Sequence, residues 1–194
     1  PADLTNILSN PESEEAASIV TRIQSRSGTP TLLHAFISAF LTAALVEEAL
    51  KYFAMRMCMH RPGTVKTRMD AVACAAIVGL AFQVIEDLVY AGDMMTTLFR
   101  AVTPFHFVFG VIMGYYYGLS LISGKKSDRA KALLIPILIH GLYDFSIQCL
   151  QVNDMYIIFT LIMLVLMLVL TIFMIVRIRK WTREGTLDEP LPIR

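Results

Sequence analysis

Five stretches of this chain are each long and apolar enough to cross a membrane as a helix, and this feature limits the fold more than any other. They lie near residues 32–57, 71–92, 101–123, 132–151 and 155–177. About 20 apolar residues in a helix span the hydrocarbon core, and lipid offers no hydrogen-bond partner to a bare backbone, so each stretch must be helical. The sequence therefore predicts an all-α protein, a polytopic transmembrane helical bundle with five visible spans.

The composition agrees with a chain that lies in the lipid bilayer. The sequence is 56% hydrophobic and 17% charged, whereas a soluble domain has about 45–50% apolar and 25% charged residues. Its 17 basic and 16 acidic residues give a net charge of +1, so the bulk charge does not indicate a nucleic acid partner. The cysteines Cys58, Cys74 and Cys149 have no paired spacing, so neither a disulfide scaffold nor a thiolate zinc site is indicated.

The distribution of Lys and Arg predicts how the spans are oriented. Basic residues gather after the first, third and fifth spans, whereas the other two connections hold only Arg100. The positive-inside rule therefore puts the three basic segments in the cytoplasm. We expect an extracytoplasmic segment at 1–30, a transmembrane domain at 31–177 and a cytoplasmic tail at 178–194. The chain starts at Pro1 rather than Met, which suggests a fragment from which earlier spans are missing.

Ionisable side chains lie inside four of the five spans. An ionisable group near the bilayer centre costs at least about 2.5–3.5 kcal/mol, so a set of them indicates a functional site. The set comprises Glu47, Glu48, Lys51, Glu86, Asp87, His106, His140 and Asp144.

Helical spacing sorts these residues into pairs. Glu47 and Lys51 are four residues apart and share a face, while Glu48 points about 100° away. His140 and Asp144 are also four apart, which suits either two metal ligands or a base with its orienting carboxylate. Glu86, His106 and Asp144 are expected in the outer half of the membrane and Glu47 and His140 nearer its middle. We expect one hydrated cavity, open to the outside, to gather these five.

Such a cavity has two chemical interpretations. Imidazoles and carboxylates together form the ligand mixture of a catalytic zinc site. Without a metal, a carboxylate would activate water directly.

Structural interpretations stay open for several of the same residues. Glu47 and Lys51 can form a structural ion pair. Asp87 can be a solvated or helix-capping neighbour of Glu86, and His106 can be a core histidine. A stripe of small residues on the third span favours helix packing within one protomer over dimerisation; its members are Gly110, Gly114 and Gly118.

The order of these motifs resembles the PrsW family of intramembrane proteases, in a superfamily with the CAAX prenyl endopeptidases and the bacteriocin-processing enzymes. The resemblance covers about residues 40–146. It rests on four successive motifs, Glu47-Glu48-x-x-Lys51, Phe82-x-x-x-Glu86, His106 and His140-x-x-x-Asp144.

The resemblance implies a peptidase in a bacterial or archaeal plasma membrane. Its substrate would be a membrane-anchored protein, such as an anti-sigma factor, cut on the extracytoplasmic side. Carried over from the superfamily, Glu47 is the base, Glu86 is its partner in the second motif, and His140 with Asp144 is the last element. The sequence alone does not decide whether Glu47 or Glu48 is the working acid.

Two departures from the superfamily pattern favour a metal. The second motif usually ends in His and here ends in Glu86; the last motif often ends in Asn and here ends in Asp144. Both changes add negative charge, and carboxylates crowded in one dry cavity repel each other unless they are protonated or bridged by a cation. We therefore expect an intramembrane metalloprotease that binds zinc. The expected ligands are Glu86, His106, His140 and Asp144.

Three alternatives remain open at this stage. The first is a metal-independent glutamate protease. The second is a proton-coupled transporter or channel, because buried acids and histidines also form proton relays. The third is a non-catalytic membrane scaffold with the same fold.

Overall fold

The computed structural model describes residues 31–61, 63, 65–89 and 103–192. Five helical segments are long and apolar enough to span a membrane, which confirms the all-α fold class. The predicted extracytoplasmic segment at 1–30 and most of the connection that holds Arg100 lie outside the described residues. The elements in chain order are α3 (Leu32–Phe36), η1 (Ile37–Ala44), α4 (Leu45–Met59), α5 (Arg68–Val89), α7 (Phe105–Ser123), α8 (Lys126–Val152), η2 (Asp154–Tyr156) and α9 (Ile157–Glu184).

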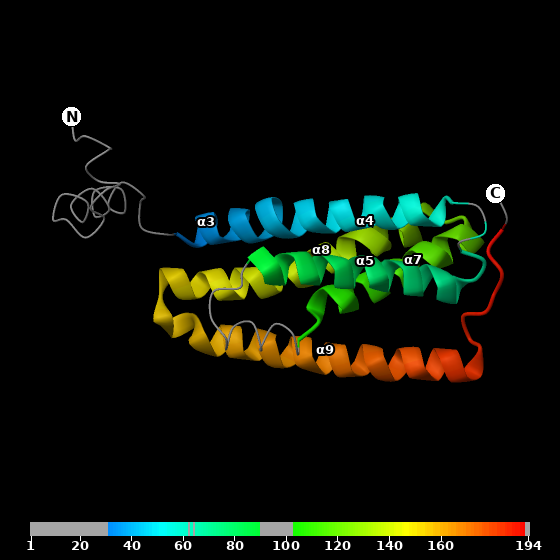
Figure 1. Cartoon of the computed structure of the whole chain (residues 1–194). Coiled ribbons are helices and arrows are strands. Elements are labelled where there is room, and N and C mark those ends of the chain that lie inside the picture. Colours follow the sequence, from blue (N-terminus) through cyan, green and yellow to red (C-terminus); the bar gives the residue numbers. More distant parts are fainter. Residues whose placement is uncertain (1–30, 62, 64, 90–102, 193–194) are drawn as a thin grey trace, which may run out of the picture.

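The first span and α9 lie on opposite sides of the bundle, and α5, α7 and α8 lie between them (Figure 1). The first span consists of α3, η1 and α4 in one continuous run. Helix α7 is the most enclosed, because 67% of the residues in its most apolar window are buried. It packs against α5 on one side and α8 on the other.

Glycines bring α5 and α7 into direct backbone contact. A methyl group added to Gly110 would lie 2.3 Å from the carbonyl oxygen of Ala75, and one added to Gly79 would lie 2.1 Å from the carbonyl oxygen of His106. Only residues without a Cβ allow this approach. The interpretation of the glycine stripe as packing within one protomer is therefore confirmed for Gly110 and Gly114, which both face α5.

A π-helical segment in the first span sets the position of α4. The eight residues of η1 precede α4 directly, and π-helical turns are rare and often found near functional sites. The Phe40 ring of η1 lies against Gly141 of α8, where an added Cβ would come within 2.4 Å of Phe40 Cδ1. This contact holds the start of α4 beside the middle of α8.

The C-terminal segment folds back on the bundle. Helix α9 extends to Glu184, so the predicted tail at 178–194 begins inside it. The chain then returns to the start of α5, where the Met69 amide donates to the Leu187 carbonyl at 3.0 Å and the Leu191 amide to the Lys66 carbonyl at 2.7 Å. Leu187 is buried by this return.

Candidate active site

A buried lysine joins the two glutamates at the start of α4. The Lys51 ammonium donates to Glu48 Oε1 at 2.7 Å and to Glu47 Oε2 at 3.5 Å. Glu48 and Lys51 are 0% and 1% exposed, whereas the side chain of Glu47 is 27% exposed. The sequence favoured Glu47 as the partner of Lys51. The shorter contact is to Glu48, because residues three apart in a helix are neighbours as well.

His106, at the start of α7, links Lys51 to the end of α5. Lys51 Nζ contacts Nδ1 of His106, and Nε2 of His106 contacts Glu86 Oε2. An ammonium group has only donors, so Nδ1 accepts and the ring proton is on Nε2, facing the Glu86 carboxylate. Lys51 and Glu86 together therefore fix one tautomer of this histidine.

His140 lies between two carboxylates near the middle of α8. Its Nδ1 is 2.9 Å from Glu48 Oε1, and its Nε2 is 3.2 Å from Asp144 Oδ2. The ring stacks on Phe109 with centroids 5.1 Å apart and lies edge to face with His106 at 5.2 Å. The spacing of His140 and Asp144 predicted that they share a face, and this pairing is confirmed.

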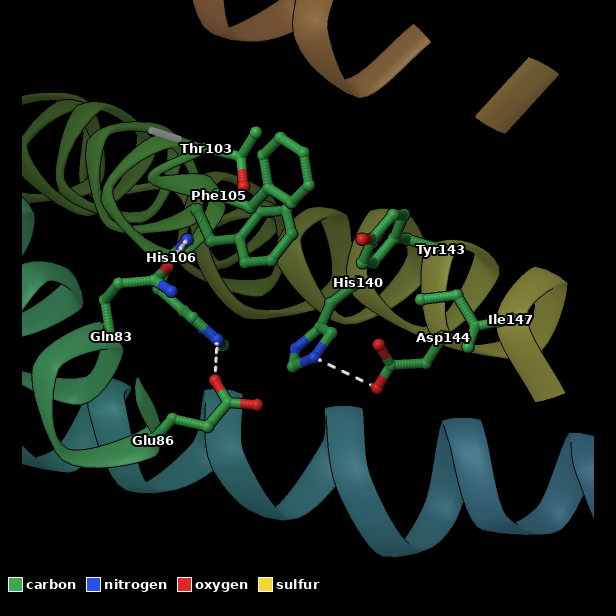
Figure 2. Close-up of a pocket in the computed structure, with 10 residues that line it drawn as sticks. Gln83, Glu86, Thr103, Phe105, His106, His140, Tyr143, Asp144 and Ile147 are labelled. Atoms are coloured by element: carbon green, nitrogen blue, oxygen red, sulfur yellow. Dashed lines mark hydrogen bonds and ion pairs between the residues drawn. The ribbon is translucent and has the colours of Figure 1, made fainter. Parts of the chain in front are cut away.

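A cavity of about 90 Å³ opens beside the two imidazoles. This volume has room for several water molecules. Figure 2 shows Glu86 beside His106 and Asp144 beside His140 around it. The cavity is lined by Gln83, Glu86, Thr103, Phe105, His106, Phe109, His140, Tyr143, Asp144 and Ile147.

Two histidines of this lining form a group with metal-binding potential together with Glu47, which is not part of the lining. Donor atoms of Glu47, His106 and His140 all lie within 4.8 Å of one another. Two imidazoles and one carboxylate match the three protein ligands of catalytic zinc sites. Of the ligand set expected from the sequence, both histidines belong to this group, whereas Glu86 and Asp144 contact the outer nitrogens of the same rings.

Several neighbours were not found by sequence reasoning. Phe109 supports both imidazoles, and its aromatic type gave no signal on an apolar span. Gln83 donates to Asp87 Oδ1 at 2.9 Å, so Asp87 has a partner within α5. Among the described residues, Glu48 Oε2 is buried and has no hydrogen-bond partner.

Comparisons with known proteins show the family to which this chain is similar. A family model described as PrsW family intramembrane metalloprotease matches residues 14–174. Curated relatives named Protease PrsW share 32% identity over 158 residues in Oceanobacillus iheyensis, 34% over 113 in Geobacillus kaustophilus and 33% over 124 in Bacillus subtilis.

These alignments cover 78%, 55% and 60% of this chain, and 70%, 50% and 56% of the relatives. The chain thus spans about half the length of two of the three relatives. No solved structure matches the chain.

Proposed function

The chain belongs to the PrsW family of intramembrane proteases, and from that premise we propose that it hydrolyses a peptide bond of a membrane-anchored protein at the cavity beside His106 and His140. The five spanning helices and the bacterial relatives make it an integral membrane protein of bacteria.

One observation carries the proposal. Four spans contribute acids or imidazoles to a single hydrogen-bonded cluster that borders a cavity: Lys51 bonds to Glu48 and His106, Glu48 to His140, His106 to Glu86, and His140 to Asp144. Burying so many ionisable groups in a membrane is expensive, and helix packing alone does not require it.

Glu47 is the stronger candidate for the general base. Peptide hydrolysis needs a group that takes a proton from water, and this group must reach the water. Glu48 is fully buried and held by Lys51 and His140. Glu47 is partly exposed and has a longer contact with Lys51. We assign water activation to Glu47, and to Glu48 the positioning of Lys51 and His140.

His140 is suited to donate a proton to the leaving amine. Both of its ring nitrogens face carboxylate oxygens, from Glu48 and Asp144. A doubly protonated ring satisfies both contacts, and the carboxylates orient it toward the cavity. Asp144 acts as the orienting partner in this scheme.

The chain's own residues also fit a divalent metal, in an alternative scheme in which Glu47 and His140 are ligands and do not have the proton-transfer roles given above. Glu47, His106 and His140 would hold it, and Glu86 and Asp144 would orient the imidazoles from their other nitrogens, as carboxylates do around histidine ligands of zinc. When bound, the metal would polarise water and stabilise the oxyanion. Nδ1 of His106 is the acceptor for Lys51, so this histidine could serve as a ligand without a change of its ring tautomer.

The metal-free alternative uses Lys51 as the resident cation. Its ammonium already contacts two glutamates and one imidazole. It reduces the excess negative charge of the cluster and orients Glu47, as a glutamate protease would need. Metal content is therefore the measurement that separates the two mechanisms.

The location of the cavity favours a cut near the outer leaflet. Glu86 is close to the end of α5, and His106 to the start of α7. The distribution of basic residues predicts that both of these ends face outward. A membrane-anchored anti-sigma factor cut on its extracytoplasmic side is the substrate type that we propose.

The test is cleavage by the purified protein in liposomes that contain single-span substrate proteins. We expect wild-type protein to cleave, and Glu47→Gln to lower the rate at least about 100-fold because the base is lost. Glu184→Gln, an equal change on exposed α9, serves as the matched control. Bound metal is measured in wild type and in His106→Ala.

Three outcomes would reject the proposal. Full cleavage by Glu47→Gln would remove the assigned base. Proton or solute flux that depends on Glu47, without cleavage of any substrate, would indicate a transporter; activity in cells that survives both Glu47→Ala and His140→Ala would indicate a scaffold.

A further inference from the structure

A second cavity lies between α7, α8 and α9, away from the acids and histidines. Its volume is about 370 Å³. Aliphatic side chains from all three helices line one part of it, and aromatic side chains line the part near the end of α9. The lining residues are Ile112, Tyr115, Tyr116, Ile135, Ile139, Leu170, Phe173, Met174, Arg177 and Trp181.

Arg177 lies on the wall of this cavity and covers two of its rings. Its guanidinium carbon is 5.4 Å from the centroid of Trp181 and 5.9 Å from that of Phe173. Such stacking holds the guanidinium plane in place and leaves its N–H groups free to donate sideways. Arg177 forms no ion pair with any residue that the structure describes.

Two further cations lie over aromatic residues of the same wall. Lys131 Nζ is 5.8 Å from the Tyr116 centroid, and the Arg68 guanidinium is 4.9 Å from that of Tyr115. The carboxylates that pair with these two cations are Asp128 and Glu189. The aromatic end of the cavity thus has three cations and two carboxylates near it.

Arg68 adds unsatisfied donors to this end of the bundle. Its side chain is 9% exposed, and Nη1 reaches Glu189 at 3.2 Å. Within the described part of the chain, Nε and Nη2 are buried and have no hydrogen-bond partner. Arg68 is not among the lining residues, so it contributes positive charge near the aromatic end of the cavity and no direct contact with a ligand there.

We propose that this cavity binds one anionic phospholipid, with the phosphate on Arg177 and one acyl chain along the aliphatic wall. Leu170 and Arg177 are separated by about 10 Å along α9, so the wall presents both an apolar stretch and a cation to one lipid. Basic pockets between spanning helices are known to bind anionic headgroups. A zwitterionic lipid fills the apolar part equally well and leaves the excess positive charge, so the charge selects the anionic lipid. The predicted orientation puts this site in the cytoplasmic leaflet.

The chain provides its own reporter for this site. Trp181 is its single tryptophan, it lines the cavity, and it is only 8% exposed. Bromine atoms on an acyl chain quench a neighbouring indole. We therefore reconstitute the full chain in nanodiscs of phosphatidylcholine and titrate in brominated phosphatidylglycerol or brominated phosphatidylcholine, measuring Trp181 fluorescence.

We expect half-quenching at a mole fraction about fivefold lower for the anionic lipid than for the zwitterionic lipid. Arg177→Gln removes most of this difference, and Arg177→Lys keeps part of it. The matched control is Arg179→Gln, an equal charge change at an exposed position two residues along α9; it keeps the preference. Leu170→Phe, which fills the aliphatic part, weakens quenching by the anionic lipid without a change in charge.

Three results would overturn the proposal. The first is equal half-quenching by both lipids in the wild-type protein. The second is an equal loss of preference in Arg177→Gln and Arg179→Gln, which would indicate diffuse surface charge. The third is recovery of fluorescence on adding inorganic phosphate, which would indicate a site for a free anion instead of a lipid.

Discussion

Helices α7 and α9 are both apolar enough to span a membrane, but the more apolar of the two is the one that the bundle leaves uncovered. In α7, 67% of the residues in the most apolar window are buried, compared with 17% in α9. Helix α7 contains the glycine stripe and His106, whereas α9 presents a succession of branched aliphatic residues to the lipid. The enclosed helix is thus the one with the polar and small residues.

This difference follows from the solvent. Lipid tails are as apolar as leucine, so burying an apolar side chain between helices gains little over leaving it in lipid. Close backbone contact and polar pairing therefore stabilise the packing of α5 against α7. Helix α9 packs against the bundle through fewer buried side chains. Helix α9 also borders the larger cavity of about 370 Å³, as a loosely packed helix would.

The largest effect is expected at Lys51 of α4, which pairs with Glu48 on the same helix and contacts His106 of α7. Lys51→Met leaves the fully buried Glu48 without its ammonium partner, and breaking such a pair costs about 3–5 kcal/mol. We expect the free energy of unfolding in mixed micelles to fall by this amount. Lys180→Met, on the exposed face of α9, is the matched control and should change stability little.

The double variant Glu48→Gln with Lys51→Met sharpens this test. It removes the stranded charge and should recover at least half of the lost stability. If the double variant is as unstable as Lys51→Met, the loss comes from the packing of the lysine stem and the ion pair is not its cause.

A smaller loss of stability is expected from substitutions at the backbone contact between α5 and α7. Gly110→Ala introduces a methyl group 2.3 Å from a backbone oxygen of α5, and the helices must separate at a cost of about 1–3 kcal/mol. Because Glu86 and His106 lie on these two helices, cleavage should fall as well.

Gly118→Ala is the control in the same stripe, because the added atom would meet no backbone oxygen there: it would lie 3.2 Å from Ala71 Cβ, 3.4 Å from Arg68 Cγ and 3.6 Å from Arg68 Cα. It should be nearly neutral in both unfolding and cleavage assays. Equal losses for Gly110→Ala and Gly118→Ala would show that helix propensity, and not the backbone contact, determines the effect.

The sequence predicted the parts of this protein that depend on local pattern. The five spans follow from apolar length, and the contact of His140 with Asp144 follows from helical spacing. The contact of His106 with Glu86 depends on how closely α5 and α7 approach, which the glycine stripe indicated only in outline.

Other features left no readable signal in the sequence. The π-helical segment at Ile37–Ala44 has the same apolar composition as an α-helix, yet it sets the position of Glu48 beside His140. Lys51 turns toward His106 on another helix, and spacing within one helix cannot reveal that contact. The roles of the site residues stay predictions until cleavage is measured.

The smallest effect is expected on the lipid face of α9. Val165 is 57% exposed, so the side chain at this position contacts mainly lipid whether it is valine or alanine. Val165→Ala should therefore change the free energy of unfolding by less than about 0.5 kcal/mol. Met167, on the same helix, is 1% exposed and packs against Phe105 and Phe109; Met167→Ala leaves a cavity and should cost about 2 kcal/mol. Comparing the two variants in one unfolding assay tests directly which face of α9 contacts lipid and which face packs against the bundle. A loss at Val165 as large as that at Met167 would mean that another protein surface, rather than lipid, covers this side of α9.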